Sequence, residues 1–546
     1  MPLSHALLHT LLLLSLSCLA SATPPFSSKA SYLSLRQDIL DKASALAFDG
    51  GTILSPIEQL LDAKLISTRD QYIRSTKQEH TFEPHHYFYE WDLQKLHQTQ
   101  LWKVMESLPK GSALHLHSGS SGSVDWIVEE GILMDGGHVY WDEDDLTRCI
   151  EPIGGAEIEC GSTGTAAPLI KGTMAFYPQN ATAPKGFYCA KHLSTTDADF
   201  ASKLRALLTS NESLKNMDSA QAWEVFNKIF VRVGPAMSFR PFYFNYLINT
   251  FQVHLDDNVQ HIEIRSLVGT NGLGDLFDFN NDGSSSSSSS SSIMIYSGDE
   301  VVDTYRQALT QFQEEVSDGF TMKLIISSLR VLDPETIEGD VQEAVDLFMR
   351  NPDLIIGFDL VAEEDPNHRT LDYLDVWMEL MKHEEKLGLE LPLYFHDGES
   401  NDRNNTNMID AVMLGSKRIG HGTNSYFFPV LFDQMREQGV VLEVNPISNQ
   451  ILRYVDNLEL HPVNGFLAEG LNVVIAADDP GAFGYTGLSY DWWAGLVAFQ
   501  LDLRSLKQLS MNSLEFSGLE GDELEVAMGR WVTAWDAWVQ RWAEDL

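Results

Sequence analysis

Eight short runs rich in apolar and β-branched residues, each followed by a longer segment with helical periodicity, restrict the folds open to this chain. Strands that alternate with helices pair in parallel through crossover connections, and eight such strands predict a closed (β/α)8 TIM barrel. An open, doubly wound α/β sheet is the alternative fold. The eight runs lie at residues 113–117, 261–266, 322–329, 354–361, 391–396, 418–420, 440–444 and 472–476.

Two amphipathic segments precede the barrel, which we expect to occupy residues 111–546. Apolar residues recur at spacings of three and four over residues 32–48 and again over 57–73. This spacing is typical of a helix with one apolar face and predicts an N-terminal helical extension over residues 23–110. The two helices either pack against the barrel or pair two chains into a homodimer.

A third amphipathic segment lies near the end of the chain and carries four tryptophans at spacings of four, three and four. We expect a terminal helix that packs its tryptophan stripe on the barrel rather than a surface for stacking a ligand. The four residues are Trp531, Trp535, Trp538 and Trp542.

Two further segments do not fit a minimal barrel. Residues 126–200, after the first strand, are rich in glycine and indicate a small inserted domain. The domain carries Cys149, Cys160 and Cys189, which allow one disulfide in three arrangements. An unbroken serine tract predicts a solvated, disordered loop over residues 280–295.

The first 22 residues resemble a secretory signal peptide, because an apolar run ends in Ala20-Ser21-Ala22, the small-x-small pattern of a cleavage site. No later apolar run approaches the ~20 residues that span a bilayer. Three Asn-x-Ser/Thr triplets, at Asn180, Asn211 and Asn404, fit the same compartment. We therefore expect a secreted, extracellular, soluble glycoprotein.

The net charge of the chain limits the kinds of molecule that it can bind. The formal charge is −41, from 78 acidic and 37 basic residues. Binding to a polyanion requires clustered Lys and Arg that displace its counterions. The composition therefore argues against a nucleic-acid polymer or an anionic membrane and favours a small-molecule substrate.

Polar residues follow the predicted strands at the end where a TIM barrel carries its active site. His115 and His117 are two residues apart on the first strand, so their side chains point to the same face. His396 ends the fifth strand, and Asp478 follows the eighth. Three imidazoles and one carboxylate at one barrel mouth predict a zinc site with a position left for water.

Two more residues supply groups that could move protons. Glu399 lies three residues after His396, and His421 ends the sixth strand. Zinc lowers the pKa of bound water from ~16 to ~7. Beside such a site, Glu399 is a candidate proton donor and His421 a candidate base that orients hydroxide. Each residue alone would more often be an ordinary loop acid or a hydrogen-bonded loop histidine.

These motifs together resemble those of the adenosine deaminases. "HLH", "HDGE", "GHG", "VNPISN" and "DDP" stand on strands one, five, six, seven and eight, in that order. The lead-in "PKGSALHLH", the segments "VDWIVEEG" and "GFDLVAEED" and the signal peptide look more specifically like the secreted adenosine-deaminase-related growth factors.

The resemblance implies a role for each site residue. His115, His117, His396 and Asp478 would hold zinc, Glu399 would protonate the purine N1, and His421 would orient and deprotonate the attacking water. Asp479 would contact the purine N7, and the backbone of Ala362, where glycine is usual, would contact the ring. Adenosine, and 2′-deoxyadenosine with it, would give inosine and ammonia. The alternatives are a deaminase of another amino-purine or modified nucleoside, and a non-catalytic, growth-factor-like nucleoside-binding protein.

Three positions depart from the family pattern. Ser118 stands where the family has an aspartate that faces the ribose, so we expect weak discrimination at the sugar unless Glu363, Glu364 or Asp365 replaces that acid. Asp397 stands where alanine is usual in "HAGE". The usual cysteine pair of the inserted segment is not clearly recoverable.

Overall fold

The computed structural model describes the chain except residues 1–27, 161–165, 179–180, 270–271 and 280–292. The expected signal peptide and most of the expected serine loop lie outside the described residues. None of the described helices is long and apolar enough to cross a membrane.

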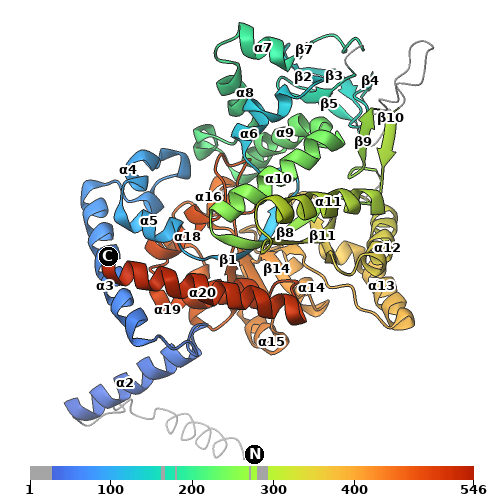
Figure 1. Cartoon of the computed structure of the whole chain (residues 1–546). Helices are drawn as coiled ribbons and strands as arrows, with labels where there is room; N and C mark the ends of the chain where they lie inside the picture. Colours follow the sequence, from blue (N-terminus) through green and yellow to red (C-terminus); the bar gives the residue numbers. More distant parts are fainter. Residues whose placement is uncertain (1–27, 161–165, 179–180, 270–271, 280–292) are drawn as a thin grey trace, which may run out of the picture.

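Eight parallel strands form the centre of the molecule (Figure 1). They fall into two four-stranded sheets, in the orders β1-β8-β11-β12 and β13-β14-β15-β16. The strands are β1 (Gly111–His117), β8 (Val259–Ser266), β11 (Thr321–Leu329), β12 (Ile355–Val361), β13 (His396–Asp397), β14 (Arg418–His421), β15 (Val441–Val444) and β16 (Asn472–Ile475).

Two single parallel bridges join these sheets into a closed barrel. Phe358 of β12 pairs with Leu393, just before β13, and its backbone N–H donates to the carbonyl of Pro392 at 2.9 Å. At the other seam Leu116 of β1 pairs with Asp478, just after β16. The (β/α)8 prediction is therefore confirmed, and the open-sheet alternative is wrong.

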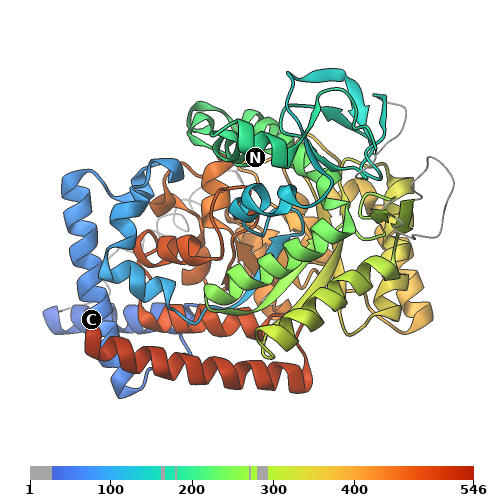
Figure 2. The same ribbon diagram turned by 45° about the horizontal axis from the view of Figure 1, so that its top comes forward.

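Helices cover the outside of the barrel between consecutive strands (Figure 2). Local signals set their ends: the side chain of Asp333 accepts from the backbone N–H of Thr336 at the start of α12, and Gly388 takes the left-handed conformation that ends α13. The outer helices include α10 (Arg240–Asp256), α11 (Asp299–Glu315), α12 (Pro334–Arg350), α13 (Leu374–Leu387), α14 (Asn407–Met413), α15 (Phe432–Gln438), α17 (Val463–Ala468) and α19 (Leu503–Glu515).

The chain between β1 and β8 builds a separate layer above the barrel mouth (Figure 1). Two three-stranded antiparallel sheets there share a small apolar core that includes Tyr140, Ile150 and Phe187. A disulfide joins Cys149 to Cys160, and Cys189 is free and exposed. The layer comprises α6 (Val124–Glu129), β2 (Gly137–Tyr140), β3 (Asp145–Ile150), β4 (Glu157–Glu159), β5 (Ala167–Leu169), β6 (Met174–Phe176), β7 (Phe187–Cys189), α7 (Ala190–Thr196), α8 (Phe200–Leu208) and α9 (Ser219–Met237). A hairpin of β9 (Leu276–Phe279) and β10 (Ile293–Tyr296) follows β8.

The N-terminal helices behave differently from each other. Helix α3 (Pro56–Glu79) lies against the terminal helix α20 (Gly521–Asp545), where Nε1 of Trp535 donates to Oε1 of Glu58 at 2.7 Å. All four tryptophans of α20 are buried, as expected. Helix α2 (Lys29–Leu46) has no buried residue and projects away from the body in Figure 1.

Candidate active site

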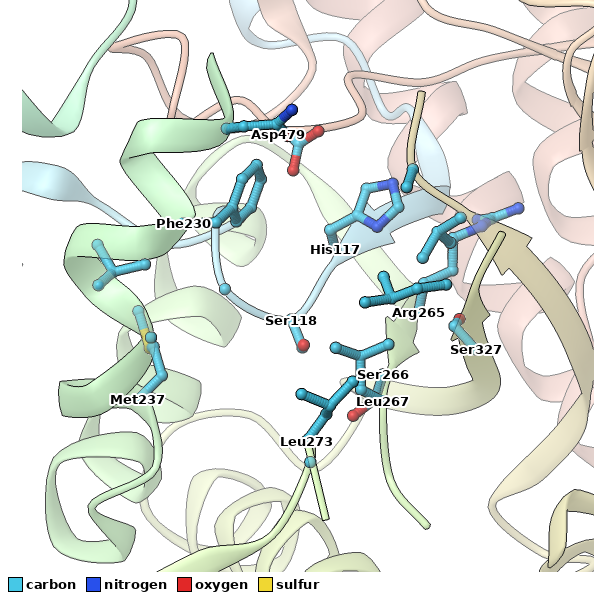
Figure 3. A pocket seen from close by; sticks show the side chains of 18 of the residues that line it. His117, Ser118, Phe230, Met237, Arg265, Ser266, Leu267, Leu273, Ser327 and Asp479 are labelled. Atoms are coloured by element: carbon cyan, nitrogen blue, oxygen red, sulfur yellow. The ribbon is translucent and has the colours of Figure 1, made fainter. Parts of the chain in front are cut away.

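A cavity of about 530 Å³ opens at the carboxyl ends of the barrel strands (Figure 3). Seven of the eight site residues expected from the sequence line it, and the eighth, His115, lies fully buried beside them. The lining seven are His117, Ala362, His396, Glu399, His421, Asp478 and Asp479.

Nitrogen and oxygen donors crowd together at the bottom of this cavity. Single donor atoms of His115, His396, His421 and Asp478 all lie within 4.8 Å of one another. Oδ1 of Asp478 lies 3.0 Å from Nε2 of His117 and 3.3 Å from Nε2 of His115. Asp478 is therefore the centre of the cluster, with the expected ligands around it and His421 on its other side.

Two buried carboxylates orient the imidazoles. Nδ1 of His115 lies 2.7 Å from Oε2 of Glu443, and Nδ1 of His396 lies 2.7 Å from Oδ2 of Asp359. Each ring therefore donates through Nδ1 and turns its Nε2 lone pair toward the cluster. Nε2 of His115, although fully buried, has no hydrogen-bond partner among the described residues.

An arginine ties these two carboxylates together. Arg265 of β8 lies 2.6 Å from Oδ2 of Asp359 and 2.6 Å from Oε2 of Glu443, and all three side chains are fully buried. Burial alone would raise the pKa of Glu443, but Arg265 and Arg418 hold it well below its usual range. A neutral-imidazole and carboxylate donor set with an orphaned buried nitrogen fits a bound cation such as zinc.

The sequence analysis missed Arg265, Asp359 and Glu443. A signal was available for Asp359 and Glu443, since each is a charged residue in an otherwise apolar strand. Such residues inside a barrel require partners from neighbouring strands, which only the assembled fold identifies.

Two acids in the cavity have raised pKa values. Burial, together with the charge of Asp478, raises the pKa of Glu399 well above its usual range. The same two causes raise the pKa of Asp479, which also hydrogen-bonds to Ser120. By contrast, the adjacent rings of His115 and His117 hold the pKa of Asp478 well below its usual range although burial would raise it. The site thus favours the ionised form of Asp478 and the protonated forms of Glu399 and Asp479, and a protonated acid can donate a hydrogen bond.

A chain of hydrogen bonds sets the tautomer of His421. Burial lowers the pKa of His461 to about 3, so its ring is neutral, and its Nδ1 accepts from the backbone N–H of Val463 at 3.1 Å. Its Nε2 therefore donates to Oδ1 of Asn449 at 3.0 Å, and the amide nitrogen of Asn449 donates to Nδ1 of His421 at 3.1 Å.

The hydrogen bond that Nδ1 of His421 accepts determines the state of its other ring nitrogen, Nε2. Burial lowers the pKa of His421 well below its usual value, so the ring is neutral and carries its proton on Nε2. That atom lies 3.7 Å from Oε1 of Glu399 and 3.8 Å from Oδ2 of Asp478. His421 thus presents a hydrogen-bond donor to the space between these two groups.

Three residues at the mouth have left-handed backbone conformations: Ala362 (φ 87°), His421 (φ 62°) and Asp478 (φ 65°). They follow or end β12, β14 and β16. A side chain in this region costs free energy, and such residues gather where surrounding structure holds a functional group in place.

The two substituted motif positions have different surroundings. Asp397 turns away from the cavity, where Thr370 donates to it at 2.7 Å and Arg330 lies 3.2 Å away. Ser118 lines the cavity close to the hydroxyls of Tyr243 and Tyr305. Asp397 is therefore part of the scaffold, whereas Ser118 faces the substrate side.

Of the acids that could replace a carboxylate at Ser118, Glu364 is already engaged. Its oxygens accept from the backbone N–H groups of Gly398 and Glu399, each at 2.8 Å. Glu363 lines the cavity, and burial raises its pKa to about 7.

Several known proteins named as adenosine deaminases are similar in sequence to this chain. The family model for adenosine deaminase matches residues 284–528. Adenosine deaminase 2 of Sus scrofa is 28% identical over 540 residues, covering 95% of this chain and 96% of that protein. Adenosine deaminase 2 of Dictyostelium discoideum is 29% identical over 445 residues, covering 80% of this chain and 74% of that protein.

Solved structures share the fold at low sequence identity. A zinc-bound amidohydrolase from Burkhoderia ambifaria superposes with a TM-score of 0.52 at 15% identity, covering 81% of this chain and 94% of that one. The N6-methyl-AMP deaminase of Arabidopsis thaliana gives 0.51 at 13% identity, covering 80% and 99%.

Proposed function

We propose that this chain, which belongs to the adenosine deaminase family, is a zinc-dependent deaminase that hydrolyses adenosine, and 2′-deoxyadenosine with it, to inosine and ammonia. The observation that carries the proposal is that Glu399 and Asp479, whose pKa values are both raised, share one cavity with the His and Asp cluster. An acid, an ionised carboxylate and an oriented imidazole together match what hydrolysis of an amino-purine requires.

His115, His117, His396 and Asp478 are the residues that would hold the zinc, with His421 next to them. When bound, zinc supplies a water activated for attack near neutral pH. His421, with its proton on Nε2, would orient that water by donating a hydrogen bond rather than deprotonate it, and the ionised Asp478 beside it would accept a hydrogen bond from the water.

Glu399 and Asp479 bind the nitrogen atoms of the purine ring. Glu399 donates its proton to N1, which makes C6 more electrophilic, and Asp479 donates a hydrogen bond to N7. Both ring nitrogens are acceptors, so each needs a donor, and the raised pKa values of the two acids supply one. The backbone of Ala362 contacts the ring from β12 as a third anchor.

The charges of the cavity favour a nucleoside over a nucleotide. Arg265 is the one Lys or Arg among the described residues that line the cavity, and two carboxylates already engage it. A phosphate would find no free cation and would face Glu363 and Asp275 instead. Another uncharged amino-purine remains the alternative substrate, whereas Glu399 and His421 argue against a purely binding role.

Two further parts of the proposal concern the whole protein. The apolar start of the chain and its three Asn-x-Ser/Thr triplets support secretion as a glycoprotein. Helix α2 buries none of its residues and exposes Leu33, Ile39, Leu40 and Leu46, which supports pairing of two chains into a homodimer.

One experiment tests the activity directly. Purified protein is incubated with adenosine, 2′-deoxyadenosine and adenine, and deamination is followed by ultraviolet absorbance before and after chelation and after zinc is restored. Conversion of adenosine that is lost on chelation and regained with zinc supports the proposal. Absence of conversion in protein with full zinc content refutes it.

A further inference from the structure

We infer that the nucleoside cavity ends in an apolar subsite for an uncharged substituent on the 5′ carbon of the ribose, so that 5′-deoxy-5′-alkylthio adenosines are among the preferred substrates. This inference rests on the proposed function and names the substrate class of that same cavity.

The cavity continues well beyond the catalytic groups. In Figure 3 Asp479 lies at one end, Leu267 and Leu273 lie at the other, and Ser118 projects into the space between them. Met237 of α9 closes the side of this far end. The volume of about 530 Å³ therefore spans two chemically different regions.

Purine contacts orient a nucleoside along this axis. With N1 at Glu399 and N7 at Asp479, the bond from N9 to the sugar points away from the cluster around Asp478. Ser118 directly follows His117, and β8, which ends before Leu267, is the neighbour of β1 in the sheet. The sugar's path away from the purine thus leads past Ser118 toward Leu267.

The far end has an apolar lining and a neutral hydroxyl group at its entrance. Met237, Leu267 and Leu273 line this end (Figure 3). These side chains, two leucines and a methionine, suit a thioether or alkyl group, which gains by leaving water.

The hydroxyls beside Ser118 are already satisfied by one another. Tyr243 and Tyr305 share a hydrogen bond, and Tyr305 donates to Oγ of Ser266 at 2.7 Å. A carboxylate at position 118 would need the sugar's 5′ hydroxyl or water as a partner, because a buried charge is costly when unpaired. Serine is uncharged and needs no such partner, so an apolar 5′ group can lie beside it without leaving a buried charge unpaired.

Glu363 and Asp275 also line the cavity. Glu363 follows β12, whereas Leu267 follows β8, two strands away in the sheet order. Asp275 adjoins the apolar end, and burial raises its pKa. The same burial disfavours the charged form of Asp275, which lessens its conflict with an apolar neighbour.

The test compares two substrates that differ in a single group. The zinc-loaded full-length enzyme is assayed for kcat/KM with adenosine, 5′-deoxyadenosine and 5′-deoxy-5′-methylthioadenosine. In an apolar subsite, one added apolar group on the substrate raises kcat/KM by ~10-fold or more. We expect kcat/KM for the methylthio compound to exceed that for 5′-deoxyadenosine by at least this factor.

Two variants locate the effect. Leu267→Asn makes the far end polar, and Ser118→Asp places a charge at its entrance. Each should lower the ratio of kcat/KM for the methylthio compound to that for 5′-deoxyadenosine by ~10-fold, toward one. The ratio is internal to each protein, so a variant that is partly unfolded still reports it.

A native ratio of one or less, with adenosine deaminated normally, overturns the inference and leaves the proposed function standing. A high native ratio that neither variant changes also overturns it, because the methylthio group would then be held elsewhere. If no nucleoside is deaminated by the zinc-loaded enzyme, both the proposed function and this inference fail.

Discussion

Nδ1 of His396 lies 2.7 Å from Oδ2 of Asp359, and the same oxygen lies 2.6 Å from Nε of Arg265. One buried carboxylate oxygen therefore sets the ring of an expected metal ligand and is itself held by an arginine. Residues that orient metal-binding histidines in this way contribute to metal affinity without touching the metal.

Asp359→Asn should weaken zinc binding by ~10–100-fold, because an amide cannot hold both the imidazole N–H and Arg265 as the carboxylate does. Competition with a zinc chelator measures the change. Asp340→Asn is the matched control, since Asp340 is also a buried acid but bonds to Ser328 in the outer layer. Equal zinc affinity in the Asp359 variant and the native protein would contradict the orienting role.

Glu399→Gln should retain zinc and lose ~10²–10⁴ in kcat, because glutamine cannot transfer a proton to N1. In the native enzyme burial raises the pKa of Glu399, so its proton is present at neutral pH and is lost only as pH rises through that raised value. Turnover should therefore decline on the alkaline side. The profile of kcat against pH checks this, and a Gln variant with near-native kcat would remove Glu399 from the mechanism.

Gly420→Ala should reduce zinc content. A Cβ at Gly420 of β14 would come within 2.9 Å of Cε1 of His115 and 3.2 Å of Cγ of His396, so both rings would have to move. Elemental analysis of the purified variant gives the zinc content. In Gly529→Ala, on α20, the added Cβ meets nothing within 4 Å, and zinc content should stay at the native level; a full complement in both variants would count against the close approach.

Ala362→Gly should raise the free energy of unfolding by ~1–2 kcal/mol, because a residue with a Cβ is strained at φ 87° and glycine is not. Thermal and denaturant unfolding of the zinc-loaded protein measure it. The same change at Ala527, inside helix α20, should lower stability by ~1 kcal/mol. A loss of stability in both variants would show that the backbone at Ala362 carries no strain.

Deletion of residues 1–46 should convert a homodimer into a monomer and leave the barrel folded. Helix α2 ends at Leu46 and buries none of its residues, whereas α3 buries Leu61, Leu65 and Ile73. Light scattering of the full-length and shortened proteins at equal concentration decides the matter. A full-length monomer at micromolar concentration would contradict pairing through α2.

The barrel was predictable because each inner strand is an apolar run and each intervening segment has helical spacing. The same pattern placed His115, Glu399 and Asp478 near one mouth, since a closed parallel barrel brings all strand ends together. The pairing of Cys149 with Cys160 was not predictable, because three arrangements were equally compatible with the sequence.

The two N-terminal helices show a second limit of prediction from the sequence. Residues 32–48 and 57–73 have similar apolar spacing, yet α3 packs against α20, whereas α2 buries none of its residues. Spacing identifies an apolar face but does not say what covers it. Likewise, the tautomer of His421 depends on Asn449 and His461, whose hydrogen bonds arise only in the folded chain.

The bridge between Leu116 and Asp478 also bears on the order of folding. The expected zinc ligands come from β1, β13 and the end of β16, so the first and last strands of the barrel must meet before the site exists. Contacts between such distant parts of a chain form late, because a long loop must close first. Metal capture thus belongs to the final stage of refolding, and helical circular dichroism should recover before zinc uptake begins.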